Sequence, residues 1–313
     1  MSELPRLVVV LGPTASGKSA LGVTLAKQLG GEVLVCDSTQ VYRHFDIGTA
    51  KVPPAEQAGI PHHLVDLLEP ADVFTAGDYR RCAIAALDDL RRRNKVPILT
   101  AGTGLYLRAL LEGLADAPTR SEGLRARLRE RAQVRGLDYL HKILRRLDSK
   151  AASRIAPRDA QKTIRALEIR LLTGKAVEEV HGAGRERLEG YRVVKIGLLP
   201  PRPALYEKIH TRVDAMMAAG WLDEVRRLIG MGIPAEAKPF HFIGYSELRA
   251  HLEGRMPLEA AIQQIQQATR NFAKRQLTWF RKEPGVSWLT TFGDSPDAVE
   301  AALDLAKRGT TGN

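Results

Sequence analysis

The residues that point most directly to chemistry form one short segment, GPTASGKS, at residues 12–19. An apolar, β-branched run precedes it and a helix-forming run follows it, which is the context in which the pattern GxxxxGK[ST] holds phosphate. Its glycines let the backbone curl so that several N–H groups point at one phosphate, and the following helix adds its positive N-terminal end. The pattern predicts a di- or triphosphate site formed by Gly12, Pro13, Thr14, Ala15, Ser16, Gly17, Lys18 and Ser19.

Within this segment Lys18 supplies a point charge, and the Ser19 hydroxyl is placed to ligate Mg²⁺. The pattern does not indicate which reaction uses the phosphate, because many unrelated chemistries share this loop. The sequence also leaves open whether the loop admits nucleotides such as ATP.

Two further segments carry polar residues directly after predicted buried strands. CDSTQVYR, at residues 36–43, brings Asp37, and AGTGLYL, at residues 101–107, brings Thr103. Ligands of open α/β sheets bind beyond the carboxyl ends of the strands, so both side chains are expected near the phosphate loop. A carboxylate there can hold Mg²⁺, usually through water, or take a proton from a nucleophile. The alternative is that Asp37 and Ser38 only cap the following turn.

Two other segments have a structural interpretation that is at least as simple. His62 and His63 lack the HExxH or carboxylate spacing of a zinc site, so a structural or supporting role is favoured over metal binding. ATRNFAKRQLTWFRK, at residues 268–282, places Arg270 and Lys274 on one helical face and aromatic residues on another. By itself this pattern is typical of an amphipathic helix with a basic edge.

Five apolar, β-branched runs predict the buried strands of a parallel sheet, and helical stretches separate most of them. The pattern indicates an α/β fold with helices on both faces of the sheet. The exception is the interval 118–187, which contains no such run and predicts charged helices inserted between the third and fourth strands. We expect a catalytic core at 1–117 and 188–313 and a basic helical insertion at 118–187. The predicted strands are 6–11, 32–37, 96–101, 193–199 and 286–291.

The chain is basic, with 47 Lys and Arg against 36 Asp and Glu and a formal net charge of +11. Residues 118–187 hold 18 Lys or Arg and 9 Asp or Glu, so +9 of this charge lies in under a quarter of the chain. Such a localised patch favours a polyanionic partner, with nucleic acid the most direct choice. Net charge alone also fits a basic enzyme without a polyanionic partner.

Composition excludes several protein classes. No run of 18 or more apolar residues is present, so no membrane-spanning helix is predicted. The N-terminal MSELPRLVVVLG lacks the features of a secretory signal. Cys36 and Cys82 have no CxxC spacing and are expected to be reduced thiols. We therefore expect a cytoplasmic protein, without membrane contact and monomeric.

Seven segments of the chain occur together in one order: GPTASGKS, DSTQVYR, AGTGLYL, APRDAQKTIRALEI, GWLDEVRRL, IGYSEL and ATRNFAKRQLTWFR. From about Leu7 to Trp288 the chain resembles the tRNA dimethylallyltransferases, also called tRNA isopentenyltransferases, of bacterial type. The resemblance implies a P-loop kinase-like core with a helical insertion. It also implies transfer of a dimethylallyl group from dimethylallyl diphosphate to N6 of the adenine 3′-adjacent to the anticodon in tRNA, assisted by Mg²⁺. The loop would then hold a leaving diphosphate.

The resemblance also implies roles for individual residues. Asp37 matches the general base of the family, Thr103 a catalytic residue beside the adenine or its proton path, and Arg212 an arginine that binds the diphosphate. Because an anticodon-loop base must leave its stack to reach such a site, base flipping is expected. The positions that match tRNA-contacting segments are Asp37, Ser38, Thr39, Gln40, Thr103, Arg125, Gln161, Lys162, Thr163, Ile164 and Arg165. Arg125 is the first choice for a basic contact early in the insertion, and Arg127 is the second.

Three places depart from the family pattern. Ala101 stands where the family usually has glycine, and Arg158-Asp159 with Lys162 replaces a common Asn-Asp with a downstream arginine. PFHFIGYSEL, at residues 239–248, carries two phenylalanines and a histidine where small residues are commoner, namely Phe240, His241 and Phe242.

Three other functions share parts of this pattern. A small-molecule P-loop kinase using ATP has the same loop and strand-end carboxylate, but it does not need an insertion of charge +9. Prenyl transfer to free adenine nucleotides keeps the chemistry, and the basic insertion counts against it. A non-catalytic RNA-binding protein has no need of intact Lys18, Ser19 and Asp37.

Overall fold

The structure is a computed structural model, and it describes residues 4–115, 117–182 and 186–308. The chain divides into two compact units. The sheet unit comprises residues 1–110 and 189–313, and the helical unit comprises residues 111–188.

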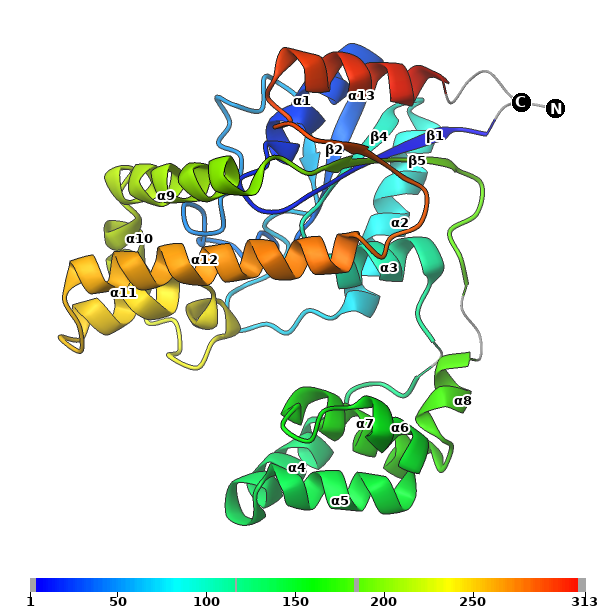
Figure 1. Cartoon of the computed structure of the whole chain (residues 1–313), viewed down its shortest axis with the longest axis vertical. Coiled ribbons are helices and arrows are strands. Elements are labelled where there is room, and N and C mark those ends of the chain that lie inside the picture. The colour runs from blue at the N-terminus through cyan, green and yellow to red at the C-terminus, as the bar shows by residue number, and fades with distance from the viewer. Residues whose placement is uncertain (1–3, 116, 183–185, 309–313) are drawn as a thin grey trace. The chain divides into compact units, whose positions relative to one another are not determined.

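The sheet has six strands in the order β3-β2-β4-β1-β5-β6, and every neighbouring pair is parallel (Figure 1). β2 is buried along its whole length, as are all but the first residues of β1 and β4. Continuous burial is typical of parallel strands that helices cover on both faces. The strands are β1 Arg6–Leu11, β2 Gly31–Cys36, β3 His62–His63, β4 Val96–Ala101, β5 Arg192–Leu198 and β6 Val286–Leu289.

Helices cover both faces of this sheet. α1 (Lys18–Leu29) and α13 (Pro296–Arg308) pack on one face, where Leu21 and Ala302 join the strand residues Val8 and Ile98 in one apolar core. Figure 1 shows α2 and α3 on the opposite side of the sheet. The remaining helices of the unit, with these two, are α2 Ala76–Arg92, α3 Gly104–Glu112, α9 Arg202–Ala218, α10 Trp221–Gly230, the 3₁₀ helix η1 Lys238–His241, α11 Tyr245–Leu252 and α12 Leu258–Phe280.

All five predicted strands are confirmed, with ends within two residues of those expected. The sequence missed β3, because it has only two residues and both are histidines. His63 Nε2 lies 2.7 Å from a carboxylate oxygen of the buried Glu32, which also receives two hydrogen bonds from Arg93. This contact gives the histidine pair a structural role, and the described residues include no cluster of three His, Cys, Asp or Glu able to hold a metal.

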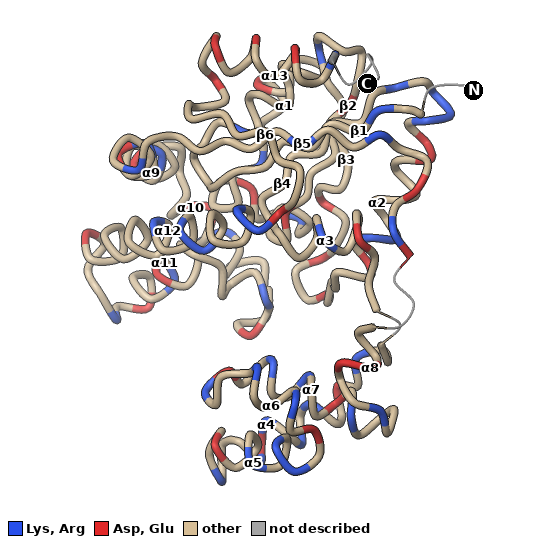
Figure 2. Tube along the Cα trace, turned by 45° about the vertical axis from the view of Figure 1, so that its right-hand side comes forward, with Lys and Arg blue, Asp and Glu red and all other residues tan. Residues whose placement is uncertain are grey.

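The helical unit contains no strand in its described part and has its own apolar core, with Leu140, Leu144 and Leu167 fully buried at its centre. Lys and Arg residues are spread along its helices (Figure 2). None of the described helices of the protein is both long and apolar enough to cross a membrane. The helices of the unit are α4 Glu122–Arg135, α5 Leu137–Leu147, α6 Ser149–Arg154, α7 Ala160–Thr173 and α8 Val177–Gly182.

One buried carboxylate ties the helices of this unit together. Glu168 is fully buried and accepts hydrogen bonds from Arg125 Nε and Nη2 at 2.9 and 2.7 Å, from Arg165 Nη1 at 2.6 Å and from Ser121 N at 2.7 Å. Burial alone would raise the pKa of Glu168, but the hydrogen bonds from Arg125, Arg165 and Ser121 outweigh it and lower the pKa to about 2.

Glu168→Ala is expected to destabilise the helical unit by about 3 kcal/mol, because two guanidinium groups and one N–H lose their acceptor together. In the wild-type protein, the contribution of Glu168 is complete above pH 4.5 and is lost as the pH falls from about 4.5 towards 2. Urea unfolding followed by circular dichroism checks both statements. The control is Glu130→Ala at an exposed position of α4, where a change within about 0.5 kcal/mol is expected. Equal effects of the two substitutions would contradict the role given to Glu168.

Candidate active site

The parallel register brings three strand ends to one rim of the sheet. Ala101 at the end of β4 pairs with Leu11 of β1 and with Cys36 of β2, so the three strands end at the same level. The residues that follow them are Gly12, Asp37 and Gly102. The two segments predicted to lie near the phosphate loop therefore do so.

The phosphate loop, residues 12–19, joins β1 to α1 through a left-handed backbone. Gly17 has φ 85°, and a Cβ there would lie 2.8 Å from the backbone nitrogen of Gly293, so only glycine fits. Ala15 also has a positive φ of 63°, a conformation that non-glycine residues adopt rarely and often at functional sites. Because α1 starts at Lys18, its first N–H groups have no intrahelical partner and are available to an anion.

One side chain from the C-terminal half of the chain joins this loop to the end of β4. Gln276 of α12 is 5% exposed; its Oε1 accepts from Thr14 N at 2.8 Å, and its Nε2 donates to Gly102 O at 2.8 Å. Sequence reasoning singled out the segment around Gln276 but not this residue. The available signal was a single amide among the core-facing positions of an amphipathic helix.

Three charged groups meet at the loop. Arg212 Nη1 of α9 donates to Thr14 Oγ1 at 3.1 Å, and Lys18 Nζ donates to Pro13 O at 3.4 Å. Burial and the positive charge of Arg212 lower the pKa of Lys18 to about 8, against the opposing influence of Asp37. Burial also lowers the pKa of Arg212. Two cations held close together beside one carboxylate form a site that favours a bound anion.

Asp37 caps the turn that follows β2, which is one of the roles weighed for it. Its Oδ1 accepts from Thr39 N at 2.8 Å and from Thr39 Oγ1 at 2.6 Å, which caps the turn. Its Oδ2 lies on the other side, where a Cβ on Gly102 would be 2.6 Å from it and 3.5 Å from Lys18 Cε. Asp37 therefore caps the turn through one oxygen and faces Gly102 and Lys18 with the other.

Thr103 and Gly104 complete the rim. Thr103 Oγ1 accepts from Ser38 N at 3.0 Å and donates to Ser38 Oγ at 3.3 Å, so it links the ends of β2 and β4. A Cβ on Gly104 would lie 2.0 Å from Trp279 Cδ1, so glycine at this position lets the indole pack against the start of α3. Ala101, the first departure from the family pattern, is fully buried in the strand.

The remaining positions predicted to contact tRNA fall into two groups. Gln40 in the sheet unit donates from Nε2 to Thr49 O and Ala50 O at 3.1 and 3.2 Å, which folds its side chain back onto its own loop. Arg125 and Arg165 in the helical unit are both held by Glu168.

The other predicted contacts lie on α7. The side chains of Thr163 and Ile164 are only 1% and 8% exposed, so they pack inside the helical unit. Gln161 and Lys162 beside them are exposed, and Lys162 forms an ion pair with Asp159 at 2.8 Å.

The sequence model of the family described as IPP transferase matches residues 40–283. The chain is 50% identical over 298 residues to a tRNA dimethylallyltransferase of Solibacter usitatus (strain Ellin6076), covering 95% of this chain and 97% of that protein. It is 47% identical over 303 residues to a tRNA dimethylallyltransferase of Koribacter versatilis (strain Ellin345), covering 97% and 98%.

Solved structures give the same result. The full-length tRNA isopentenylpyrophosphate transferase of Bacillus halodurans is similar with a TM-score of 0.71 and 37% identity, covering 97% of this chain and 98% of that one. A eukaryotic dimethylallyltransferase acting on tRNA is similar with a TM-score of 0.81 and 26% identity, covering 97% and 79%. The resemblance drawn from the seven motifs is confirmed, and the chain belongs to the tRNA dimethylallyltransferase family of enzymes.

Proposed function

We propose that this enzyme transfers a dimethylallyl group from dimethylallyl diphosphate to N6 of the adenine 3′-adjacent to the anticodon in tRNA and releases diphosphate. The observation that carries the proposal is the meeting of Lys18, Arg212 and Asp37 beside the phosphate loop. Two cations suit a diphosphate leaving group, and the carboxylate suits an amine that must lose a proton. The names of the relatives in both comparisons support the same reaction.

The phosphate loop would serve the leaving group. The bond between C1 of the dimethylallyl group and the diphosphate oxygen breaks, and its electron pair leaves on the diphosphate. Loop N–H groups, Lys18, Arg212 and the Thr14 hydroxyl would stabilise this charge as preorganised donors. A bound diphosphate would also offset the repulsion between the two cations; burial and this repulsion together lower the pKa of Lys18 in the free enzyme.

Asp37 would serve the nucleophile. Adenine N6 is a poor nucleophile because its lone pair is delocalised into the ring, so removing its proton as the N6–C1 bond forms lowers the barrier. Oδ1 of Asp37 is occupied by Thr39, and Oδ2 would take the proton. The adenine would reach this oxygen by leaving the anticodon-loop stack.

The residues present suit a Mg²⁺ ion. Mg²⁺ binds through one or two protein oxygens together with phosphate oxygens and water. The partly exposed Ser19 hydroxyl in the first turn of α1 would ligate it directly, and Asp37 would do so through water. When bound, the ion supplies positive charge to the leaving diphosphate.

The helical unit would hold the RNA backbone through one face of α4. Arg127, Arg131 and Arg135 follow one another at four-residue spacing and are all exposed, and none forms an ion pair with a described residue. Together with Glu130, Val134 and Tyr139, on whose ring Arg135 stacks at 5.1 Å, they line a hollow of about 420 Å³. Three arginines against one carboxylate leave this hollow positive, and a positive surface beside an aromatic ring is the chemistry of nucleic-acid binding.

The first test is the product. Incubation of unmodified tRNA with enzyme, Mg²⁺ and dimethylallyl diphosphate, without ATP, should add one five-carbon unit to adenosine, measured by mass spectrometry of the digested nucleosides.

Asp37→Asn keeps an acceptor for Thr39 and removes the base, so the single-turnover rate should fall about 10²- to 10⁴-fold with tRNA affinity little changed. A strict need for ATP, or an unchanged rate in Asp37→Asn, would contradict the mechanism.

The second test uses the titration of Lys18. Only the protonated form of Lys18 attracts the diphosphate, and the pKa of Lys18 is about 8. The affinity for dimethylallyl diphosphate is therefore highest below pH 8 and falls above it. The KM for dimethylallyl diphosphate at saturating tRNA should rise about tenfold per pH unit above pH 8 to 8.5. Lys18→Arg, which does not titrate in this range, should lack the rise, and the same rise in that variant would exclude Lys18 as its source.

The third test compares two sets of three charges. Replacing Arg127, Arg131 and Arg135 by Gln should weaken tRNA binding and reduce the slope of log K against log salt by about 2 to 3, because up to three phosphate contacts are lost. The control replaces Arg81, Arg92 and Arg226, three exposed arginines of the sheet unit paired with Asp78, Asp89 and Asp223. Filter binding at several salt concentrations measures both sets, and equal slopes would remove α4 from the RNA surface.

A further inference from the structure

Another buried carboxylate, that of Glu224, forms no ion pair with a described residue. Glu224 of α10 is 2% exposed; Oε2 accepts from Asp46 N at 3.1 Å and Ile47 N at 2.8 Å, and Oε1 accepts from Tyr245 Oη at 2.6 Å, with Gly48 N at 3.5 Å. Burial, together with the Glu224 charge, raises the pKa of Tyr245, so its hydroxyl stays a donor. A buried charge held only by neutral donors is costly, which calls for a reason beyond packing.

The backbone that Glu224 holds belongs to the catalytic loop, residues 37–51, which leads away from β2. The far end of this loop is joined to its near end, because Gln40 donates to Thr49 O and Ala50 O, and Lys51 Nζ donates to Tyr42 O at 2.7 Å. A displacement of residues 46–48 would therefore also displace Gln40 and the turn capped by Asp37.

Aromatic packing holds the same loop against the bracket, by which we mean residues 220–249 in α10, η1 and α11. Trp221 is 2% exposed and lies against two glycines; a Cβ on Gly48 would be 2.2 Å from its Nε1, and one on Gly244 would be 2.0 Å from its Cζ2. Phe45 of the loop packs on Tyr245 and Phe240 with ring centroids 4.8 and 5.5 Å apart.

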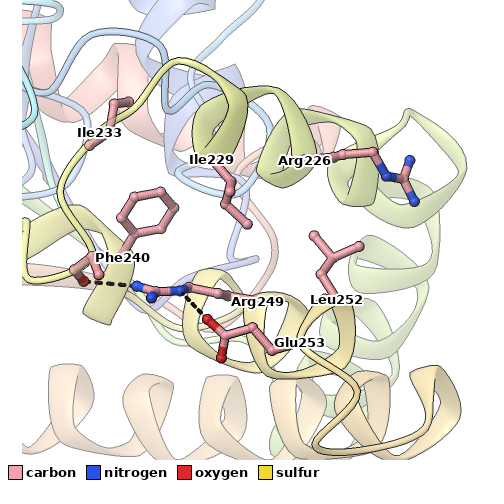
Figure 3. Close-up of a pocket in the computed structure, with 8 residues that line it drawn as sticks. Arg226, Ile229, Ile233, Phe240, Arg249, Leu252 and Glu253 are labelled. Atoms are coloured by element: carbon pink, nitrogen blue, oxygen red, sulfur yellow. Dashed lines mark hydrogen bonds and ion pairs between the residues drawn. The ribbon is translucent and has the colours of Figure 1, made fainter.

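The unusual PFHF segment is part of this packing. Phe242 meets Tyr42 of the loop at 5.8 Å, and Phe240 is covered on its outer side by the guanidinium of Arg249 at 5.3 Å. Figure 3 shows Phe240 beside Arg249. Arg249 forms an ion pair with Glu253 at 2.8 Å, and these three residues line a hollow of about 430 Å³. The departure from the family pattern thus adds two rings that fix the loop from outside.

We propose that Glu224 is a positioning residue for prenyl transfer, acting through the catalytic loop on Asp37 and Gln40. The inference rests on the proposed function. Aromatic packing alone holds the loop against the bracket but does not fix its position along that surface. The hydrogen bonds from three consecutive N–H groups to one carboxylate fix where residues 46–48 lie. A shift of about 1 Å at a general base can cost about 100-fold in rate.

The experiment compares Glu224→Gln with Leu228→Ala. Glu224→Gln is nearly isosteric, but its amide nitrogen must face a donor, so the loop loses part of its anchor. The kcat should fall about 10- to 100-fold while the KM for dimethylallyl diphosphate stays within about twofold, because Lys18 and Arg212 are untouched. Leu228 is fully buried on the same helix, and Leu228→Ala should lower the melting temperature and leave kcat unchanged well below it.

A second readout needs no activity. Amide hydrogen exchange over residues 38–50 of the free enzyme should rise at least tenfold in Glu224→Gln and stay at the wild-type level in Leu228→Ala. Raised exchange, together with a lower kcat and a nearly unchanged KM, supports the proposal. A loss of kcat no larger than that of Leu228→Ala overturns it. Absence of prenylated adenosine with the wild-type enzyme would contradict the proposed function but not the role of Glu224 in holding the loop. Unchanged exchange in Glu224→Gln would overturn that role, whether or not the enzyme is active.

Discussion

The site depends on the level at which three parallel strands end. Leu11, Cys36 and Ala101 end in register, so the residues after them leave the sheet together and on the same rim. In an antiparallel arrangement one of these loops would leave from the opposite edge. The phosphate loop and Asp37 are neighbours because of this register.

Electrostatics limits which side chains can hold such a rim together. Burial and the positive charge of Arg212 already lower the pKa of Lys18, so a third cation would weaken the site in the free enzyme. Gln276 joins the loop to β4 with one acceptor and one donor and adds no charge. A neutral amide can satisfy a backbone N–H and a backbone carbonyl at once, because its acceptor and its donor are separate atoms.

Glu168 and Glu224 illustrate two ways of stabilising a buried carboxylate. Glu168 is neutralised by two arginines, Arg125 of α4 and Arg165 of α7, and holds these two helices of the helical unit together. Glu224 is satisfied by backbone N–H groups and one phenol, and it holds a loop rather than a core. An arginine beside Glu224 would also stabilise the charge, but the backbone donors define the position of the loop directly.

The sequence by itself determined the strands, the phosphate loop, the inserted helices and the family, because each depends on a local pattern of apolar runs, glycines or motif spacing. Only the tertiary structure decided which side chains are partners. Gln276 meets Thr14 across 262 residues, Glu224 meets Ile47 across 177, and Arg125, expected on the RNA surface, is paired with Glu168. Thr163 and Ile164 were expected in contact with RNA, and they are in the core of their unit. Such partnerships depend on which helix faces meet when the chain packs, and no local pattern records that.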